Sequence, residues 1–97
     1  MQRTLLMTLK IYNRSKRFER NFKKLPQEIK DAFYNQFKKF HTSHPTMHPS
    51  LRVKGVQSKK GIYEMTVTMD VRATFEYIED GVLFRNIGSH DETIKNA

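Results

Sequence analysis

Two different periodicities divide this sequence, and they restrict the fold more than any other feature. In the first half, apolar residues recur three or four positions apart, as on one face of a helix: Phe18, Phe22 and Leu25, then Ile29, Ala32, Phe33, Phe37 and Phe40. From Leu51 onwards, apolar and polar residues mostly alternate, which is the period of strands with one buried face. Both patterns must share one small core, because the chain has only 97 residues. The sequence therefore predicts a single α+β domain over residues 1–97.

The spacing predicts two helices and five strands. We expect the strands at about 5–11, 51–56, 62–69, 71–77 and 82–87. The two helices lie on either side of Pro26, which suits the first turn of a new helix. An Asp80-Gly81 pair predicts a tight hairpin before the last strand. The resulting order, β-α-α-β-β-β-β, describes a small, mainly antiparallel sheet with a two-helix hairpin packed on one face. If translation starts at Met7, residues 1–6 are a dispensable extension.

The charge is positive and unevenly distributed. Residues 1–60 contain fifteen lysines and arginines and three acidic residues, whereas residues 61–97 contain three lysines and arginines and seven acidic residues. The net charge of the whole sequence is +8. A basic first half favours a polyanionic partner, with nucleic acid first and an acidic protein as the alternative. Lysines such as Lys23 and Lys38 would also serve simply to keep exposed helix faces soluble.

Composition excludes several classes of protein. The sequence has no cysteine, which rules out disulfides and thiolate metal sites. No apolar run approaches the roughly 18 residues that a membrane-spanning helix needs. We therefore expect a cytoplasmic domain with no membrane partner.

The sheet face opposite the helices is expected to collect cations. Alternation along the strands places Arg52, Lys54 and Arg72 on the side that faces away from the core. Arg85 would join them unless it pairs with Glu76. Cations that converge on a sheet surface bind phosphates. The sequence therefore predicts an open phosphate-binding surface, with two further RNA contacts in the next turn, at Lys59 and Lys60.

Common enzyme motifs are missing from the sequence. There is no phosphate-binding glycine loop, no nucleophile elbow and no His-Glu-x-x-His pair. His41, His44 and His48 lie close together, but Pro45 and Pro49 prevent a helix that would align them. We interpret them as ordinary loop histidines and expect no metal site there.

Three segments stand out together: RFERNFKKLPQEIKDAF, then HPSLRVKGV, then GIYEMTVTMDVRATFEYIEDGVLFRNIGSHDE, which contains Ile-Gly-x-His-Asp near its end. In this order they resemble the toxins of the RelE/ParE superfamily, from bacterial type II toxin–antitoxin systems, and the similarity covers about 11–95. The RelE and YafQ-like branch is the most similar. The resemblance implies a RelE-like fold and a cognate antitoxin protein as partner. Members of the RelE branch cut mRNA in the ribosomal A site without a metal ion or other cofactor, whereas ParE-type members poison DNA gyrase.

The resemblance also implies where the chemistry takes place. In the RelE branch, a ribose 2′-hydroxyl attacks the neighbouring phosphate, which requires a base, an acid and cations around the phosphoryl oxygens. His90 matches the C-terminal histidine of the family and would act as general acid or base, a task for which imidazole is suited near neutral pH. Asp91 would either orient this imidazole or cap a short helical turn at Asp91–Lys95. Arg72 matches a family arginine that would stabilise the transition state.

The departures from the family pattern leave the activity open. Some RelE members carry paired lysines on the strand around Glu64, and YafQ-like members a histidine near Thr66; this sequence has neither. Glu64 would repel phosphate if it faced the site, and it is also a candidate ion-pair partner for Arg72, as is Glu76. His48, whose His-Pro pair resembles one in YafQ-like members, would supply a missing catalytic group. The preferred function is a ribosome-dependent endoribonuclease. The alternatives are a ParE-like gyrase inhibitor and an inactive member that only binds antitoxin.

Overall fold

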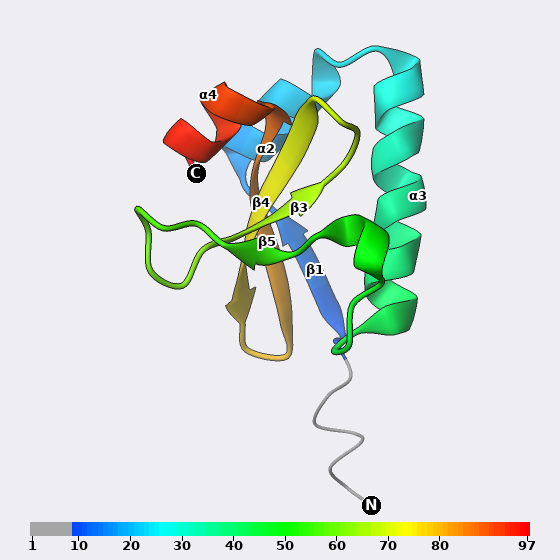
Figure 1. The fold of residues 1–97 in the computed structure, drawn as a ribbon, viewed down its shortest axis with the longest axis vertical. Helices are drawn as coiled ribbons and strands as arrows, with labels where there is room; N and C mark the ends of the chain where they lie inside the picture. Colours follow the sequence, from blue (N-terminus) through cyan, green and yellow to red (C-terminus); the bar gives the residue numbers. More distant parts are fainter. Residues whose placement is uncertain (1–8) are drawn as a thin grey trace, which may run out of the picture.

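The computed structural model describes residues 9–97 and contains a five-stranded sheet of order β1-β5-β4-β3-β2 (Figure 1). The elements are β1 (Ile11–Arg14), α2 (Lys16–Lys23), α3 (Gln27–Ser43), the 3-10 helix η1 (Pro49–Leu51), β2 (Lys54–Gly55), β3 (Tyr63–Thr66), β4 (Val71–Ile78), β5 (Gly81–Ser89) and α4 (His90–Lys95). β1 runs parallel to β5, and all other neighbours are antiparallel. The predicted fold class is therefore confirmed. The start of the first predicted strand and the extension at residues 1–6 lie outside the described residues.

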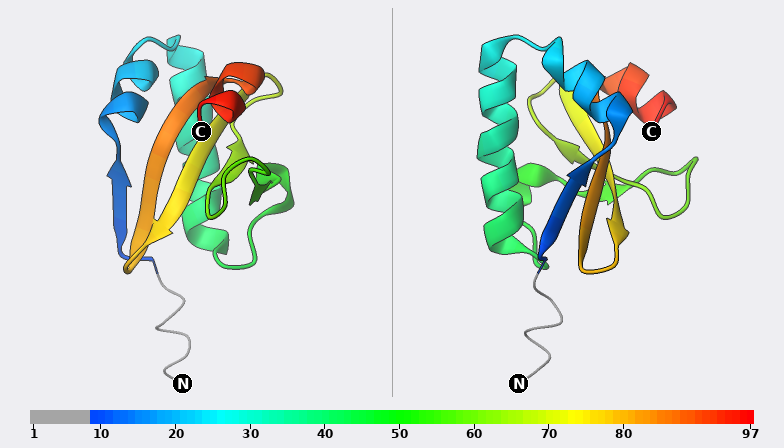
Figure 2. Two further views of the ribbon diagram at one scale, coloured as in Figure 1. Left: turned by 90° about the vertical axis from the view of Figure 1, so that its left-hand side faces the viewer. Right: turned by 180° about the vertical axis from the view of Figure 1, so that it is seen from behind.

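The two predicted helices form and cover the same face of the sheet (Figure 2). Ser15 begins α2, because its hydroxyl accepts a hydrogen bond from the amide of Phe18 at 3.0 Å. Pro26 occupies the N-cap position of α3, where its missing N–H costs nothing. Within residues 9–97, no helix is long and apolar enough to cross a membrane.

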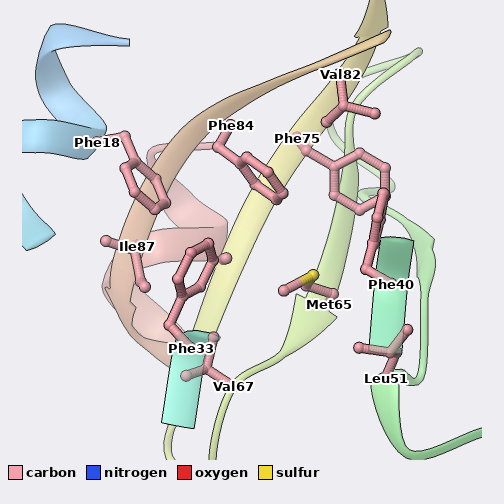
Figure 3. Packing of buried hydrophobic residues seen from close by; sticks show 11 residues of the cluster. Phe18, Phe33, Phe40, Leu51, Met65, Val67, Phe75, Val82, Phe84 and Ile87 are labelled. Carbon is pink, nitrogen blue, oxygen red and sulfur yellow. The ribbon is translucent and has the colours of Figure 1, made fainter. Parts of the chain in front are cut away.

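The aromatic stripe of the helices is the core, as the spacing predicted (Figure 3). Phe18 from α2 and Phe33 and Phe40 from α3 meet Phe75 and Phe84 from the sheet, and all five are at most 3% exposed. The ring centroids of Phe40 and Phe75 lie 5.0 Å apart, with the rings nearly perpendicular. Edge-to-face packing of this kind favours one fixed arrangement of the rings. The sheet is thereby held firmly from one side.

The hairpin between β4 and β5 forms, but its turn lies one residue earlier than predicted. Ile78 pairs with Gly81, so the loop residues are Glu79 and Asp80, and Asp80 has a positive φ of 62°. Gly81 is needed for a different reason. A Cβ at this position would lie 2.0 Å from the carbonyl oxygen of Ile11. The glycine lets β1 approach the sheet edge.

A β-bulge in β5 decides which side chains face the helices. The pairing between β4 and β5 shifts between Thr74 and Phe75, so Arg85 is an extra residue on β5. Beyond the bulge, Ile87 belongs to the core and Asn86 is buried on the other face, beside Thr74. The sequence pattern did not reveal this shift, because the bulge interrupts the alternation.

Two predicted strands are shorter than expected. The strand predicted at 51–56 was wrong in its first half, because Leu51 ends η1 there. Only Lys54–Gly55 forms a strand, which pairs with β3. The strand predicted at 62–69 ends at Thr66, and Met69, which was expected within it, is 85% exposed. The hydroxyl of Thr68 accepts hydrogen bonds from the amides of Asp70 and Val71 and so closes a tight turn at this point.

The sheet face opposite α2 and α3 is only partly open, which corrects the prediction of a fully open surface. α4 packs across β4 and β5 on this side. Ile94 and Ala97 at its end join Val56 and Ile62 in a second, smaller apolar cluster. The exposed part of this face therefore lies beside the beginning of α4.

Candidate functional site

A cleft opens where α4 begins, and we call it the His90 cleft. It consists of two hollows of about 310 and 450 Å³ that share Lys54, Glu64 and His90. Their other lining residues come from the loops on either side of β2 and from β2, β3, β4 and α4: Arg52, Val53, Thr66 and Arg72 in the first, and Gly55, Val56, Gln57, Ser58 and Ile94 in the second. Of the predicted site residues, the fold brings His90, Arg72, Arg52 and Lys54 together here.

The turn between β3 and β4 holds the backbone of His90 and the guanidinium of Arg72. The amide of His90 donates to the carbonyl oxygen of Asp70 at 2.8 Å. Nη1 of Arg72 donates to the carbonyl oxygens of Thr68 and Met69 at 2.8 and 3.0 Å. Two residues that are distant in sequence thus contact one short turn, which keeps them close together.

His90 has a carboxylate partner next to it in the chain. Nδ1 of His90 lies 3.0 Å from Oδ1 of Asp91. A proton on Nδ1 therefore bonds to Asp91 and leaves Nε2 for a substrate. The expected helix-capping role of Asp91 is wrong, because α4 begins at His90 and Ser89 occupies the N-cap position. Of its two expected roles, the contact with the imidazole is the one that the structure contains.

Glu64 is the unexpected member of the cleft. It faces the cleft but is only 5% exposed. In the strand register it lies opposite Lys54, and its Oε1 is 3.7 Å from Nε of Arg72. The carboxylate is thus flanked by cations, which offset its repulsion of a phosphate. The predicted pairing of Glu64 with Arg72 is thus present in the structure.

Arg85 does not belong to the His90 cleft. It forms an ion pair with Glu76, and its Nε donates to the carbonyl oxygen of Ala97 at 2.9 Å. Both contacts follow from the bulge that aims Arg85 toward the end of α4. Of the two expectations for Arg85, the pairing with Glu76 is the one that the structure contains. Arg72 takes Glu64 and not Glu76 as its partner.

Arg52 has a strained backbone at the rim of the cleft. It follows η1 with φ 47° and ψ 48°, the left-handed region that residues with a Cβ rarely adopt. Such strain costs about 1–3 kcal/mol and is concentrated at functional sites. Here it makes the chain turn from η1 into β2, so that Arg52 and Lys54 both line the cleft.

The remaining candidates lie outside the cleft lining. His48 caps η1, where its Nδ1 accepts from the amide of Ser50 at 3.1 Å. Its loop lies at the C-terminal end of α3, away from α4 (Figure 1). The structure thus does not bring His48 to His90 as a substitute catalytic group. Lys59 and Lys60 are exposed in the loop after β2, just beyond the part that lines the cleft.

The other histidines have local partners. The hydroxyl of Tyr12 lies 2.6 Å from Nδ1 of His41. Burial raises the pKa of the Tyr12 hydroxyl. Within residues 9–97, no three His, Cys, Asp or Glu side chains are grouped so that they would hold a metal ion.

Comparison with solved structures relates this architecture to known proteins. No protein-family model and no curated protein matches the sequence. A chain of the E. coli DinJ–YafQ toxin–antitoxin complex superposes with a TM-score of 0.70 at 15% identity, covering 86% of this chain and 94% of that one. The chain has the RelE-like fold. A chain of the RelB–RelE antitoxin–toxin complex from Methanococcus jannaschii superposes with a TM-score of 0.68 at 15% identity, covering 87% of this chain and 96% of that one. E. coli YafQ superposes with a TM-score of 0.66 at 19% identity, covering 86% of this chain and 96% of that one.

These comparisons concern the fold, because the sequence identities are low. A shared RelE-like fold does not by itself determine chemistry. The argument for an activity therefore rests on the side chains of the His90 cleft.

Proposed function

We propose that this protein is the toxin of a toxin–antitoxin module and that it inhibits translation by cutting mRNA at the ribosome. The observation that carries the proposal is the His90 cleft, in which one imidazole and one buried carboxylate lie among three cations. The RelE-like fold supports it, since two of the similar solved structures are toxin–antitoxin complexes. A cognate antitoxin is the expected protein partner, and the ribosome and its message are the expected targets.

The residues of the cleft suit transesterification of RNA. The 2′-oxygen forms a bond to phosphorus while the bond from phosphorus to the 5′-oxygen of the next nucleotide breaks. Glu64 accepts the proton of the 2′-hydroxyl, and His90 donates a proton to the departing 5′-oxygen. Arg72 stabilises the negative charge that develops on the phosphoryl oxygens. The products are a 2′,3′-cyclic phosphate and a 5′-hydroxyl end.

The positions of the two proton carriers decide their roles. The carboxylate of Glu64 lies 3.7 Å from Nε of Arg72, the cation that would hold the phosphate. His90 is more exposed and directs its Nδ1 toward Asp91, so its Nε2 is the nitrogen that would exchange a proton with the substrate. We assign the base to Glu64 and the acid to His90 on this arrangement. Arg52 and Lys54 hold the backbone of the message at the rim.

A ParE-like gyrase inhibitor is the competing function, which the missing strand lysines favour. The two functions are separated by inducing expression and mapping the 5′ ends of cellular transcripts, while gyrase–DNA cleavage complexes are measured in the same cultures. The proposal predicts new ends within translated codons and no increase in gyrase complexes. Intact messages with stabilised gyrase complexes would show that the alternative is right. Normal growth with abundant soluble protein would indicate an inactive member.

A further inference from the structure

A second basic groove lies on the other side of α4, and we call it the α2–α4 groove. It has a volume of about 500 Å³, and Arg17, Arg20 and Lys24 line it from the side of α2. Gly88 and Asn86 of β5 form part of its floor. We propose that this groove binds the phosphodiester backbone of the mRNA strand on the 3′ side of the cut. This inference rests on the proposed function and adds a second binding site to it.

The cations of the groove share one flank of α2. Arg17, Arg20 and Lys24 are three and four residues apart, so their side chains lie in a row about 10 Å long. All three are exposed, whereas Phe18 on the opposite side of the helix is buried. Glu92 is the one acid among the lining residues. The groove is therefore positively charged along a line, as a strand of phosphates requires.

Hydrogen bonds between asparagine side chains and the backbone hold the floor of the groove in place. Nδ2 of Asn21 donates to Oδ1 of Asn86 at 2.7 Å, and Nδ2 of Asn86 donates to the carbonyl oxygen of Asn96 at 3.1 Å. Only Leu25 and Ile87 contribute aliphatic side chains to the lining. An amphipathic protein segment would need a broader apolar surface. The row of three cations matches the regularly spaced phosphates of an RNA backbone.

The α2–α4 groove lies close to the His90 cleft, with α4 between them. Gly88 lines the groove and His90 lines the cleft, so their Cα atoms are at most about 7 Å apart. α2 and α4 stand at the same end of the sheet (Figure 2). In the proposed reaction His90 protonates the 5′-oxygen of the next nucleotide. The 3′ part of the message therefore leaves on the His90 side, toward the groove.

The test compares two messages on programmed ribosomes. Both carry 2′-O-methyl groups in the A-site codon, which prevents cleavage; one ends at that codon and the other continues several nucleotides further. The wild-type protein is expected to bind the longer message more tightly. In the Arg20→Gln/Lys24→Gln variant this gain in affinity is expected to disappear. The slope of log affinity against log salt concentration should also become shallower by about 0.7 for each lost phosphate contact. Arg17 is kept, because its Nη1 contacts the carbonyl oxygen of Asn96 and supports α4.

The matched control is Lys16→Gln/Lys23→Gln, which removes the same charge from exposed positions of α2 that do not line the groove. This variant is expected to keep the gain from the longer message. Equal binding of both messages by the wild type, a preserved gain in the groove variant, or an equal loss in both variants would overturn the inference. A wild-type protein that binds neither message would instead contradict the proposed function.

Discussion

Replacing Glu64 with glutamine is the sharpest test of the proposed chemistry. Glutamine has nearly the same shape but cannot accept the proton of the 2′-hydroxyl. General base catalysis contributes about 10²–10⁴ in rate, which corresponds to about 3–5 kcal/mol of transition-state stabilisation. We therefore expect the single-turnover rate of mRNA cleavage to fall by about 10²–10⁴-fold. The assay uses saturating protein on ribosomes with a defined A-site codon, so that binding does not limit the rate.

The structure also predicts how the same substitution affects stability. The side chains of Arg72 and Glu64 are 16% and 7% exposed, so their contact is largely shielded from water. Removing one partner of a buried ion pair costs about 3–5 kcal/mol at most. We expect a smaller loss here, because Nε of Arg72 and Oε1 are 3.7 Å apart and the glutamine oxygen can remain near the guanidinium. Urea denaturation measures this loss and shows where the variant is fully folded.

Glu76→Gln is the control for Glu64→Gln. Glu76 also pairs with an arginine, Arg85, but this pair lies outside the His90 cleft. We expect this variant to lose stability without losing the cleavage rate of the folded protein. The reasoning would be refuted by a folded Glu64→Gln protein that cuts at nearly the wild-type rate. Equal slowing by Glu76→Gln would refute it as well.

Further predictions concern the other side chains of the cleft and two structural positions. His90→Ala should lower the single-turnover cleavage rate by about 10²–10⁴-fold and leave the affinity for the ribosome unchanged in a binding assay. Arg52→Ala and Lys54→Ala should each weaken binding to the message and reduce its salt dependence by about 0.7, measured by titration at several salt concentrations. Gly81→Ala should lower the thermal midpoint by forcing a methyl group to within 2.0 Å of the β1 backbone. Ser15→Ala should cost about 1 kcal/mol of unfolding free energy in urea, because it removes the cap of α2.

The architecture was predictable because its strongest signals are local. Phe18, Phe33 and Phe40 recur at helical spacing, and those positions became the core. The features that were missed depend on contacts between distant segments. The need for Gly81 comes from the approach of β1, and the bulge at Arg85 becomes visible only when β4 and β5 are paired. No property of one strand alone contains that information.

The site was predictable in part for the same reason. Alternation and the Ile-Gly-x-His-Asp ending identified Arg72 and His90, and the fold does place them in one cleft. Glu64 was predicted as a possible partner of Arg72 but not as a member of the site, because a carboxylate near phosphate suggests repulsion until its cation neighbours are known. His48 was considered because of its neighbouring proline, but the path of the chain around η1 keeps it outside the cleft lining.

The most direct test of the central claim is the chemistry of the cut ends. Purified protein is added to ribosomes whose message contains either ribose or 2′-deoxyribose at the A-site nucleotide before the cut. Our account predicts cleavage of the ribose message alone, with a 2′,3′-cyclic phosphate on one fragment and a 5′-hydroxyl on the other. Cleavage of the deoxyribose message, or fragments that carry a 5′-phosphate, would contradict it.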